Sequence, residues 1–340
     1  MEVTPTRDRV ARFVVPSGVD DPERVSGGNV YDRRLRDGLA GLGWRLAMSE
    51  ASDADGVAAA LDAVPRNGTV LVDGMVAAWH PRAVELAASR ARVVVLAHMV
   101  SSAFPDADAV SVEGERRSLG HATHVVTTSN WTASELVRRG LVERQRVTVA
   151  IPGSVDGPLA RGEAGEMLCV GAVARHKGHD VLLDALDGLR DLEWNCTIAG
   201  SREVDRGFAR EIQARAATFG PRVRMTGVLH SQDLVDAYRR SGLLVAPSRT
   251  ESFGMAIADA RRRGLPVIAA AVGGIPEAVS GGGALLVEPE DSDALGAALR
   301  RWLTDPELRD RLRAEAGRAR RGAPRWADTV ARIGRLLEAA

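Results

Sequence analysis

The feature that most constrains this 340-residue chain is an alternation of short β-branched runs with amphipathic stretches, which occurs in two series. The first series contains five runs typical of buried parallel strands, at 10–15, 70–72, 93–97, 124–127 and 146–151. The second series contains six such runs, at 167–172, 194–199, 223–226, 243–246, 266–270 and 284–287. Two consecutive βαβ series predict an α/β protein with two Rossmann-like, doubly wound domains and a cleft between them.

A stretch rich in Gly, Pro and charge, residues 152–166, separates the two series and is typical of a linker. We therefore expect an N-terminal domain at 1–155 and a C-terminal domain at 156–325. The remaining segment, 326–340, has helical spacing of its apolar residues.

The composition excludes several classes of partner. Acidic and basic residues balance at 45 each, so no net charge draws the chain to nucleic acid or anionic lipid. No apolar run reaches the roughly 18 residues that a membrane span needs, and the N-terminus lacks the apolar block of a secretion signal. Cys169 and Cys196 lie in apolar runs, as reduced core thiols do. We expect a cytoplasmic protein without nucleic acid partners or an integral membrane segment.

A basic loop follows the first strand of the second series. Of the 45 basic residues only Lys177 is a lysine, and it lies two positions after Arg175. A fork-shaped guanidinium beside a compact ammonium suits the stabilisation of a diphosphate leaving group. The alternative is a solvated basic loop, but a single lysine in an arginine-rich chain favours a function.

The stretch TESFGMAIAD, residues 250–259, carries two acids at what reads as the start of a helix. The unpaired N–H groups of its first turn could bind phosphate or sugar hydroxyls, with Glu251 at the helix mouth. These N–H groups would be those of Ser252, Phe253, Gly254 and Met255. Asp259, two turns further on, could accept hydrogen bonds from a ribose diol. A capped surface helix with two solvated acids is the alternative.

Two glycine turns lie at other strand-to-helix junctions. Gly27 and Gly28 precede the first helix, where glycine lets backbone N–H groups approach an anion. Taken alone, these glycines are explained more simply by a plain tight turn. The stretch VGGIPE, residues 272–277, repeats the arrangement, and ordinary helix initiation is its alternative.

In this order and spacing, these features resemble glycosyltransferase family 4, whose members are retaining enzymes with the GT-B fold of two facing Rossmann-like domains. The resemblance covers nearly the whole chain and is strongest over 167–287. The hallmark of the family is a glutamate, seven residues and a second glutamate. Glu251 matches the first glutamate and Asp259 stands at the second. Because Asp is one methylene shorter, the ribose contact of Asp259 is expected to be longer, water-bridged or weaker.

The resemblance implies a role for each matching residue. Glu251 and the amides that follow it would hold the donor sugar, and Asp259 the nucleotide ribose. Arg175 and Lys177 match the diphosphate-binding pair of the family.

The remaining correspondences involve the first domain. Gly27 and Gly28 match a glycine loop that closes over the same phosphates. His98 matches a histidine beside the reacting sugar, although a lone His after a strand is usually a polar end-cap. The segment 326–340 resembles a C-terminal helix that crosses back to the N-terminal domain.

The hypothesis is a retaining glycosyltransferase that moves a hexose-type sugar from a nucleotide-diphosphate sugar to a hydroxyl acceptor. The C-terminal domain would hold the donor and the N-terminal domain the acceptor. No long insertion follows His98, so we expect a small soluble acceptor. A nucleotide-sugar epimerase of the same architecture and a non-catalytic sugar-nucleotide-binding subunit remain alternatives. The basic cluster Arg33, Arg34 and Arg36 leaves a weak peripheral membrane contact open, but a solvated face explains it more simply.

The enzyme is expected to work without a cofactor or divalent metal. Acid pairs at 53/55, 106/108 and 291/293 lie in polar linkers or at helix starts, and the resemblance implies no metal. Glycosyl transfer in excess EDTA should therefore equal transfer in the presence of Mg²⁺. Loss of activity in EDTA that Mg²⁺ or Mn²⁺ restores would contradict this prediction.

Overall fold

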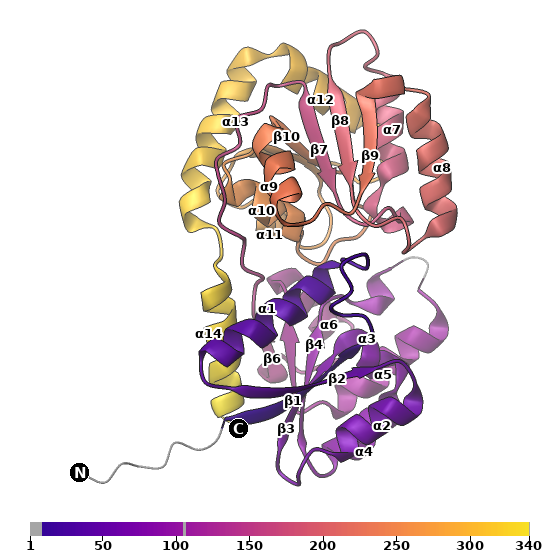
Figure 1. The fold of residues 1–340 in the computed structure, drawn as a ribbon, viewed down its shortest axis with the longest axis vertical. Coiled ribbons are helices and arrows are strands. Elements are labelled where there is room, and N and C mark those ends of the chain that lie inside the picture. Colours follow the sequence, from indigo (N-terminus) through magenta and orange to yellow (C-terminus); the bar gives the residue numbers. More distant parts are fainter. Residues whose placement is uncertain (1–8, 105–106, 340) are drawn as a thin grey trace, which may run out of the picture. The chain divides into compact units, whose positions relative to one another are not determined.

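The computed structural model describes residues 9–104 and 107–339, and it contains two parallel six-stranded sheets flanked by helices. The predicted α/β class is therefore confirmed (Figure 1). The chain divides into two compact units. Unit 1 comprises the described residues of Met1–Asp20, Gly28–Ile151 and Trp326–Ala340, and unit 2 comprises Asp21–Gly27 and Pro152–Arg325.

The sheet of unit 1 has the order β2-β1-β3-β4-β5-β6, with every neighbouring pair parallel. Its strands are β1 Val10–Pro16, β2 Arg45–Ala51, β3 Thr69–Asp73, β4 Arg92–Ala97, β5 His124–Thr127 and β6 Val147–Val149. Its helices are α1 Gly27–Gly41, α2 Ala54–Asp62, α3 Gly74–Trp79, α4 Pro81–Ala88, α5 Ala109–His121, α6 Asn130–Arg138 and α14 Trp326–Glu338. The central strands β3 and β4 bury both faces, which explains their unbroken Val and Leu runs.

The sheet of unit 2 has the order β12-β11-β10-β7-β8-β9, again parallel throughout. Its strands are β7 Glu166–Val170, β8 Asn195–Ala199, β9 Val223–Gly227, β10 Leu243–Ala246, β11 Val267–Ala270 and β12 Ala284–Val287. Its helices are α7 His179–Asp187, α8 Arg206–Ala217, α9 Ser231–Arg240, α10 Met255–Arg262, α11 Ile275–Ala278, α12 Ser292–Thr304 and α13 Pro306–Ala319. Cys169 and Cys196 are buried, free thiols in its core, as predicted.

Each sheet has one point at which the strand order reverses. In unit 1 the chain builds outward from β1 to β2 and then returns to place β3 on the other side of β1. In unit 2 it builds from β7 through β9 and returns to place β10 beside β7. Loops at such a switch point diverge to opposite faces of the sheet, which opens a crevice beyond the carboxyl ends of the strands.

The helix α14 completes the core of unit 1, although it follows unit 2 in the chain. Val330, Ile333 and Leu337 are buried in one cluster with side chains of β1 and α1. The Trp326 ring meets the ring of Tyr31 edge to face at 5.4 Å. The Thr329 hydroxyl donates to the carbonyl oxygen of Ile151, at the end of the N-terminal segment.

Several elements differ from expectation. The strand β2 was not predicted, because this edge strand is largely half-exposed and lacks an unbroken apolar run. The helices α2, α3 and α5 were not predicted either. Residues 152–165 form no helix or ladder strand, as expected of a linker. Asp53, Asp108 and Asp291 cap the N-termini of helices, while Asp106 lies outside the described residues.

Among the described residues, no helix combines the length and hydrophobicity required to cross a bilayer.

Close packing of α3 against α5 makes Gly114 a test of this fold. A Cβ at Gly114 would lie 1.9 Å from the carbonyl oxygen of Ala78, so Gly114→Ala must push the helices apart. We expect a loss of about 1–3 kcal/mol in unfolding free energy, measured by urea denaturation. Gly120 lies in the same helix, and a Cβ there would have nothing within 4 Å, so Gly120→Ala should leave stability unchanged or slightly raised. Equal losses in the two variants would contradict the packing.

Candidate functional site

Two predicted residues meet at the switch point of unit 2. Lys177 lies in the loop after β7, and Glu251 in the loop after β10. The Lys177 Nζ donates to Glu251 Oε2 at 2.5 Å, and the two side chains are 23% and 19% exposed. Burial would raise the pKa of Glu251, but the Lys177 charge and hydrogen bond hold it below its usual value. The carboxylate is therefore ionised at neutral pH and paired with the only lysine of the chain.

Backbone contacts bring these two loops together. Gly178 ends the short turn Arg175–Lys177 with a left-handed φ of 68°, and a Cβ there would lie 2.0 Å from the carbonyl oxygen of Pro247. The carbonyl oxygen of His176 accepts the N–H groups of Arg249 at 2.8 Å and Thr250 at 3.3 Å. A glycine is required at 178 both for its backbone angle and for this close approach.

The loop after β11 supports Glu251 from a third direction. The N–H of Gly274 donates to the carbonyl oxygen of Glu251 at 2.9 Å. A Cβ at Gly273, where φ is 56°, would lie 1.8 Å from that same oxygen. The two glycines of VGGIPE therefore let one loop pack against the backbone of the other.

The position of the helix after Glu251 differs from the prediction. The helix α10 begins at Met255, not directly after Glu251, because Gly254 adopts a left-handed φ of 95° as the N-terminal cap. Ser252 and Phe253 thus belong to the loop. The Phe253 side chain is buried, and its N–H group stabilises the Glu251 carboxylate. Glu251 lies in the loop before α10, and Asp259 lies on the helix itself. The two acids are therefore not separated by two helical turns, as the sequence had suggested.

Asp259 contacts the segment that enters unit 2. Its Oδ1 accepts the N–H of Val155 at 2.9 Å, and Arg263 lies one turn further along the helix with its Nη1 3.9 Å from the same oxygen. The carboxylate thus joins α10 to the linker in this structure. Its assignment to a ribose stays a prediction.

Arg175 does not share the environment of Lys177. Its side chain is 63% exposed, its Nη2 lies 3.8 Å from Glu211, and its guanidinium lies 5.2 Å from the centroid of the Phe208 ring. The structure therefore places a solvated cation near the rim of the loop and the half-buried Lys177 inside it.

Arg249 is a structural residue of this site that the sequence analysis missed. Its guanidinium forms two hydrogen bonds of 2.8 Å with the carboxylate of Asp180, and Nη1 also donates to the carbonyl oxygen of Arg175. The Nε donates to Glu290 at 2.7 Å. Arg249 therefore ties the loop of Glu251 to the loop of Lys177. The only signal in the sequence is its position two residues before Glu251.

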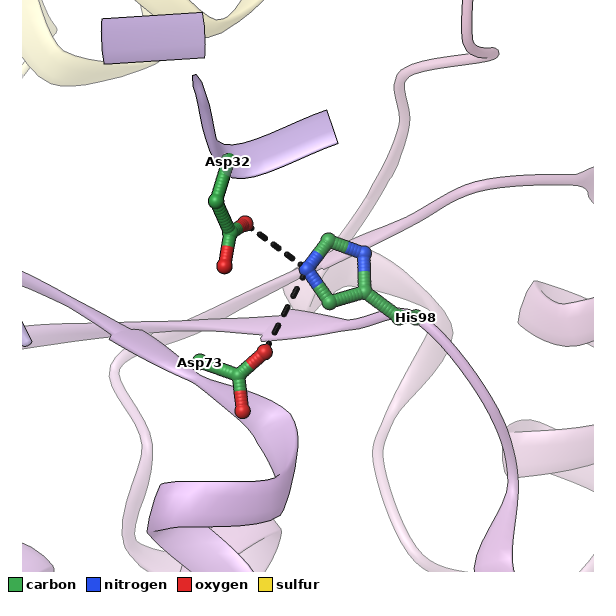
Figure 2. A group of neighbouring side chains, drawn as sticks. All are labelled: Asp32, Asp73 and His98. Atoms are coloured by element: carbon green, nitrogen blue, oxygen red, sulfur yellow. Dashed lines mark hydrogen bonds and ion pairs between the residues drawn. The ribbon is translucent and has the colours of Figure 1, made fainter. Parts of the chain in front are cut away.

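A second cluster lies at the switch point of unit 1, where Asp32, Asp73 and His98 converge (Figure 2). His98 follows β4, Asp73 ends β3, and Asp32 lies on α1. The His98 Nε2 lies 2.8 Å from Asp32 Oδ1 and 3.4 Å from Asp73 Oδ2. Both carboxylates are buried, and Asp32 Oδ2 has no hydrogen-bond partner within the described residues.

Local structure fixes Asp73 and His98 in this cluster. Asp73 caps α3, with Oδ1 accepting the N–H groups of Met75 and Val76 at 2.8 and 3.1 Å, so Oδ2 is left facing His98. A Cβ at Gly28 would lie 3.3 Å from the His98 ring, so this glycine in the first turn of α1 packs on the imidazole. Gly27 is the first residue of α1 and falls in unit 2. The proposed action of both glycines on a phosphate stays a prediction.

The charges of the cluster shift its proton affinities. Burial alone would lower the pKa of His98, but Asp32, through its charge and hydrogen bond, and Asp73 together raise it to about 8. Burial and the charge of Asp32 raise the pKa of Asp73, against the opposing effects of His98 and two backbone N–H groups.

The spacing of the cluster suits hydrogen bonding. Ligands about 2.0–2.1 Å from a tetrahedral ion lie about 3.3 Å apart, longer than the 2.8 Å between His98 and Asp32. A cavity of about 20 Å³, the room of about one water molecule, borders His98 and is also lined by Gly74, Ser101 and Glu115.

The structure thus gathers the predicted residues into two groups. Lys177, Glu251 and the loop 252–254 lie together in unit 2, with Asp259 on the helix that follows and Arg175 at the rim. His98 and Gly28 lie together in unit 1, where Asp32 and Asp73 join them. The two aspartates carry no motif, so only the fold reveals them.

Known proteins resemble this chain in sequence. The family described as "Glycosyl transferases group 1" matches residues 157–319. A D-inositol 3-phosphate glycosyltransferase of Streptomyces avermitilis is 32% identical over 62% of this chain and 50% of its own length. Another protein of that name, from Thermomonospora curvata, is 31% identical over 68% of this chain and 59% of its own length. The matched part of the chain thus spans between half and three-fifths of these relatives.

Solved structures resemble the chain over nearly its whole length. Sucrose-phosphate synthase from Thermosynechococcus elongatus superposes with a TM-score of 0.82 at 20% identity, covering 97% of this chain and 98% of that one. The Anabaena protein HepE in complex with UDP and glucose gives a TM-score of 0.77 at 15% identity, covering 97% and 99%. At these identities the likeness establishes a shared fold.

The clamp formed by Arg249 predicts a measurable loss of stability. Lysine keeps the charge but cannot make two parallel hydrogen bonds to Asp180, so Arg249→Lys should cost about 1–3 kcal/mol in unfolding free energy. Arg300 makes the same two-pronged contact with Asp191, with both bonds at 2.8 Å, but its side chain and that of Asp191 are 42% and 60% exposed. Arg300→Lys should therefore leave the melting temperature near that of the parent protein. Calorimetry that finds the same small effect for both would contradict a clamping role.

Proposed function

We propose that the protein is a glycosyltransferase that uses a nucleotide-diphosphate sugar. The proposal starts from the match of residues 157–319 to the glycosyl transferases group 1 family and from the GT-B fold. The observation that carries the proposal is the half-buried Lys177–Glu251 pair at the switch point of unit 2. The pair lies beyond the carboxyl ends of β7 and β10. Its cation can bind a negatively charged diphosphate, and its ionised acid can accept hydrogen bonds from sugar hydroxyls.

Lys177 would stabilise the departing diphosphate. As the bond between the sugar and the phosphate breaks, negative charge builds up on the phosphate oxygen, and a preorganised ammonium lowers the energy of that state. The ammonium has three N–H donors. One meets Glu251, so the others can reach phosphate oxygens without breaking the pair. Arg175, exposed at the rim, would add a second cation once the donor is bound.

Glu251 would hold the sugar. Its carboxylate can accept hydrogen bonds from sugar hydroxyls, and such contacts strengthen as the anomeric carbon becomes cationic. The surrounding loops fix its position through the N–H of Gly274 and the contact with Lys177. Asp259, at the helix, would contact the ribose, where no bond changes during the reaction.

The reaction would retain the configuration of the anomeric carbon. We assign no carboxylate among the described residues as a nucleophile. Retention can proceed without one when the acceptor attacks the same face that the diphosphate leaves. Unit 2 would bind the donor and unit 1 a hydroxyl acceptor, for which a small molecule remains our expectation. The name of the Streptomyces relative supports a polyol acceptor, and the HepE complex with UDP and glucose supports a nucleotide-sugar donor.

A panel of nucleotides and nucleotide sugars tests this proposal. Ligands that bind the folded protein raise its melting temperature, so UDP-, GDP- and ADP-sugars are compared with their nucleotides. The stabilising donor is then incubated with polyols and sugars, and products are separated by mass. Transfer or slow donor hydrolysis supports the transferase. Release of nucleotide with an epimerised sugar would identify the epimerase alternative, and binding without turnover would identify a non-catalytic subunit.

Removing the single lysine should reduce turnover severely. Lys177→Ala deletes a preorganised charge at a developing anion, so we expect kcat to fall about 100- to 1000-fold, which corresponds to about 3–4 kcal/mol. Arg206→Ala is the matched control, because that cation is 76% exposed and contacts Glu203 on the surface of the same unit. Circular dichroism checks that both variants fold. Near-parental turnover in a folded Lys177→Ala variant would refute the assignment.

A further inference from the structure

One nitrogen of the His98 imidazole, Nε2, lies close to the carboxylates of both Asp32 and Asp73 (Figure 2). This arrangement determines which ring nitrogens carry a proton. We propose that Asp32 and Asp73 are positioning residues that keep His98 doubly protonated, so that Nδ1–H donates a hydrogen bond to a substrate oxygen and His98 does not act as the base for the acceptor hydroxyl. The substrate part of this inference rests on the proposed glycosyl transfer, whereas the charge state of His98 does not.

The geometry first settles which nitrogen carries a proton. Ionised carboxylates only accept hydrogen bonds, and Nε2 lies within 2.8 Å of one carboxylate oxygen and 3.4 Å of another. Nε2 must therefore be a donor. In a neutral ring this would leave Nδ1 as an acceptor, able to take a proton. In the charged ring Nδ1 is a donor.

The charges around the ring decide between these two forms. A single carboxylate beside a histidine stabilises the cation formed after proton transfer, as in a catalytic triad. Here there are two buried carboxylates, and Asp32 Oδ2 has no hydrogen-bond partner in the described part of the chain. Two buried negative charges without a cation would be costly. The imidazolium is the positive charge that the structure places between them.

Other titratable groups around His98 do not oppose this state. From α1, the Tyr31 ring meets His98 edge to face at 5.1 Å, and its hydroxyl donates to the carbonyl oxygen of Ala150. Burial raises the pKa of Tyr31 well above its usual value, so it stays neutral. From α5, Glu115 lines the cavity beside His98, and its carboxylate accepts the N–H of Ser101. Burial raises the pKa of Glu115, but where it is ionised its negative charge adds to the preference for a cation.

The consequence for the reaction concerns the acceptor proton. When the acceptor oxygen bonds to the anomeric carbon, the bond from that carbon to the phosphate oxygen breaks and the acceptor loses its hydroxyl proton. A protonated His98 cannot take that proton, which would pass to the departing phosphate oxygen. His98 would instead hold a sugar hydroxyl or phosphate oxygen through Nδ1–H. The cluster, with two carboxylates and one imidazolium, carries one net negative charge near neutral pH.

Nuclear magnetic resonance of the full chain tests the charge state directly. Protein labelled with ¹⁵N-histidine is titrated in EDTA, with His98 assigned by comparison with His98→Gln. We expect both ring nitrogens protonated at pH 7 and a midpoint near pH 8. Asp73→Asn, which keeps the helix cap, should move the midpoint toward about 6.5, the value of an unperturbed histidine. Asp53→Asn, a change at the exposed cap of α2, should leave it unchanged.

Several outcomes would overturn the proposal. A neutral His98 at pH 7 in the parent protein would do so, as would a midpoint that Asp73→Asn does not lower. Zn²⁺ or Mn²⁺ that binds at micromolar concentration and abolishes the titration would show a metal site instead. Because the parent titration decides the question by itself, a variant that fails to fold does not prevent the test.

The pH dependence of transfer tests the role of the proton. A histidine that acts as donor requires its charged form, so kcat should fall above about pH 8 and the falling limb should move to lower pH in Asp73→Asn. A rate that instead rises through this range would identify His98 as a base and overturn the donor role. If no nucleotide sugar is turned over at any pH, the proposed function fails while the resonance titration still decides the charge of His98.

Discussion

Both sites depend on a property of parallel sheets, namely that all strands end at the same edge. Hydrogen-bonded parallel strands share one direction, so the loops that follow them meet there, and reversal of strand order opens a crevice between two of these loops. In unit 2 the reversal lies between β7 and β10, which brings Lys177 to Glu251 over 74 positions of sequence. In unit 1 the reversal beside β1 brings α1 to the end of β3, and Asp32 to His98.

The two sites treat charge in opposite ways. In unit 2 each charge has an opposite partner close by, and Arg249 is neutralised by two acids while it joins two loops. In unit 1 two buried acids converge on one imidazole, so the balance depends on a proton. The first arrangement presents a fixed cation to an anion such as a diphosphate. The second makes the charge of the site depend on pH in the physiological range.

The strands and loop residues that a local sequence pattern encodes could be predicted from the sequence. Runs such as Val93–Ala97 are strands because β-branched residues pack on both faces of a sheet, and the pattern is visible without the fold. The edge strand β2 lacks such a run and escaped prediction. Lys177 and Glu251 could be predicted as site residues from the sequences of their loops. Their ion pair could not be predicted, because it depends on β7 and β10 being neighbours in the sheet. Asp32 looks like any acid on an amphipathic helix. Its burial and its contact with His98 arise only when α1 packs over the neighbouring strands. The helix α10 begins later than predicted because Gly254 adopts a left-handed backbone conformation, which does not continue a right-handed helix and which glycine takes readily.

The contribution of α14 to unit 1 also affects the order in which the protein can be built by the ribosome. Val330, Ile333 and Leu337 fill the space against β1 and α1, yet they are translated only after the whole of Pro152–Arg325. The strand β1 and the helix α1 therefore keep an apolar face uncovered while unit 2 is synthesised. Unit 2 takes nearly all of its residues from one continuous segment and faces no such delay. An uncovered apolar face favours aggregation, so α14 protects unit 1 only once it has been made.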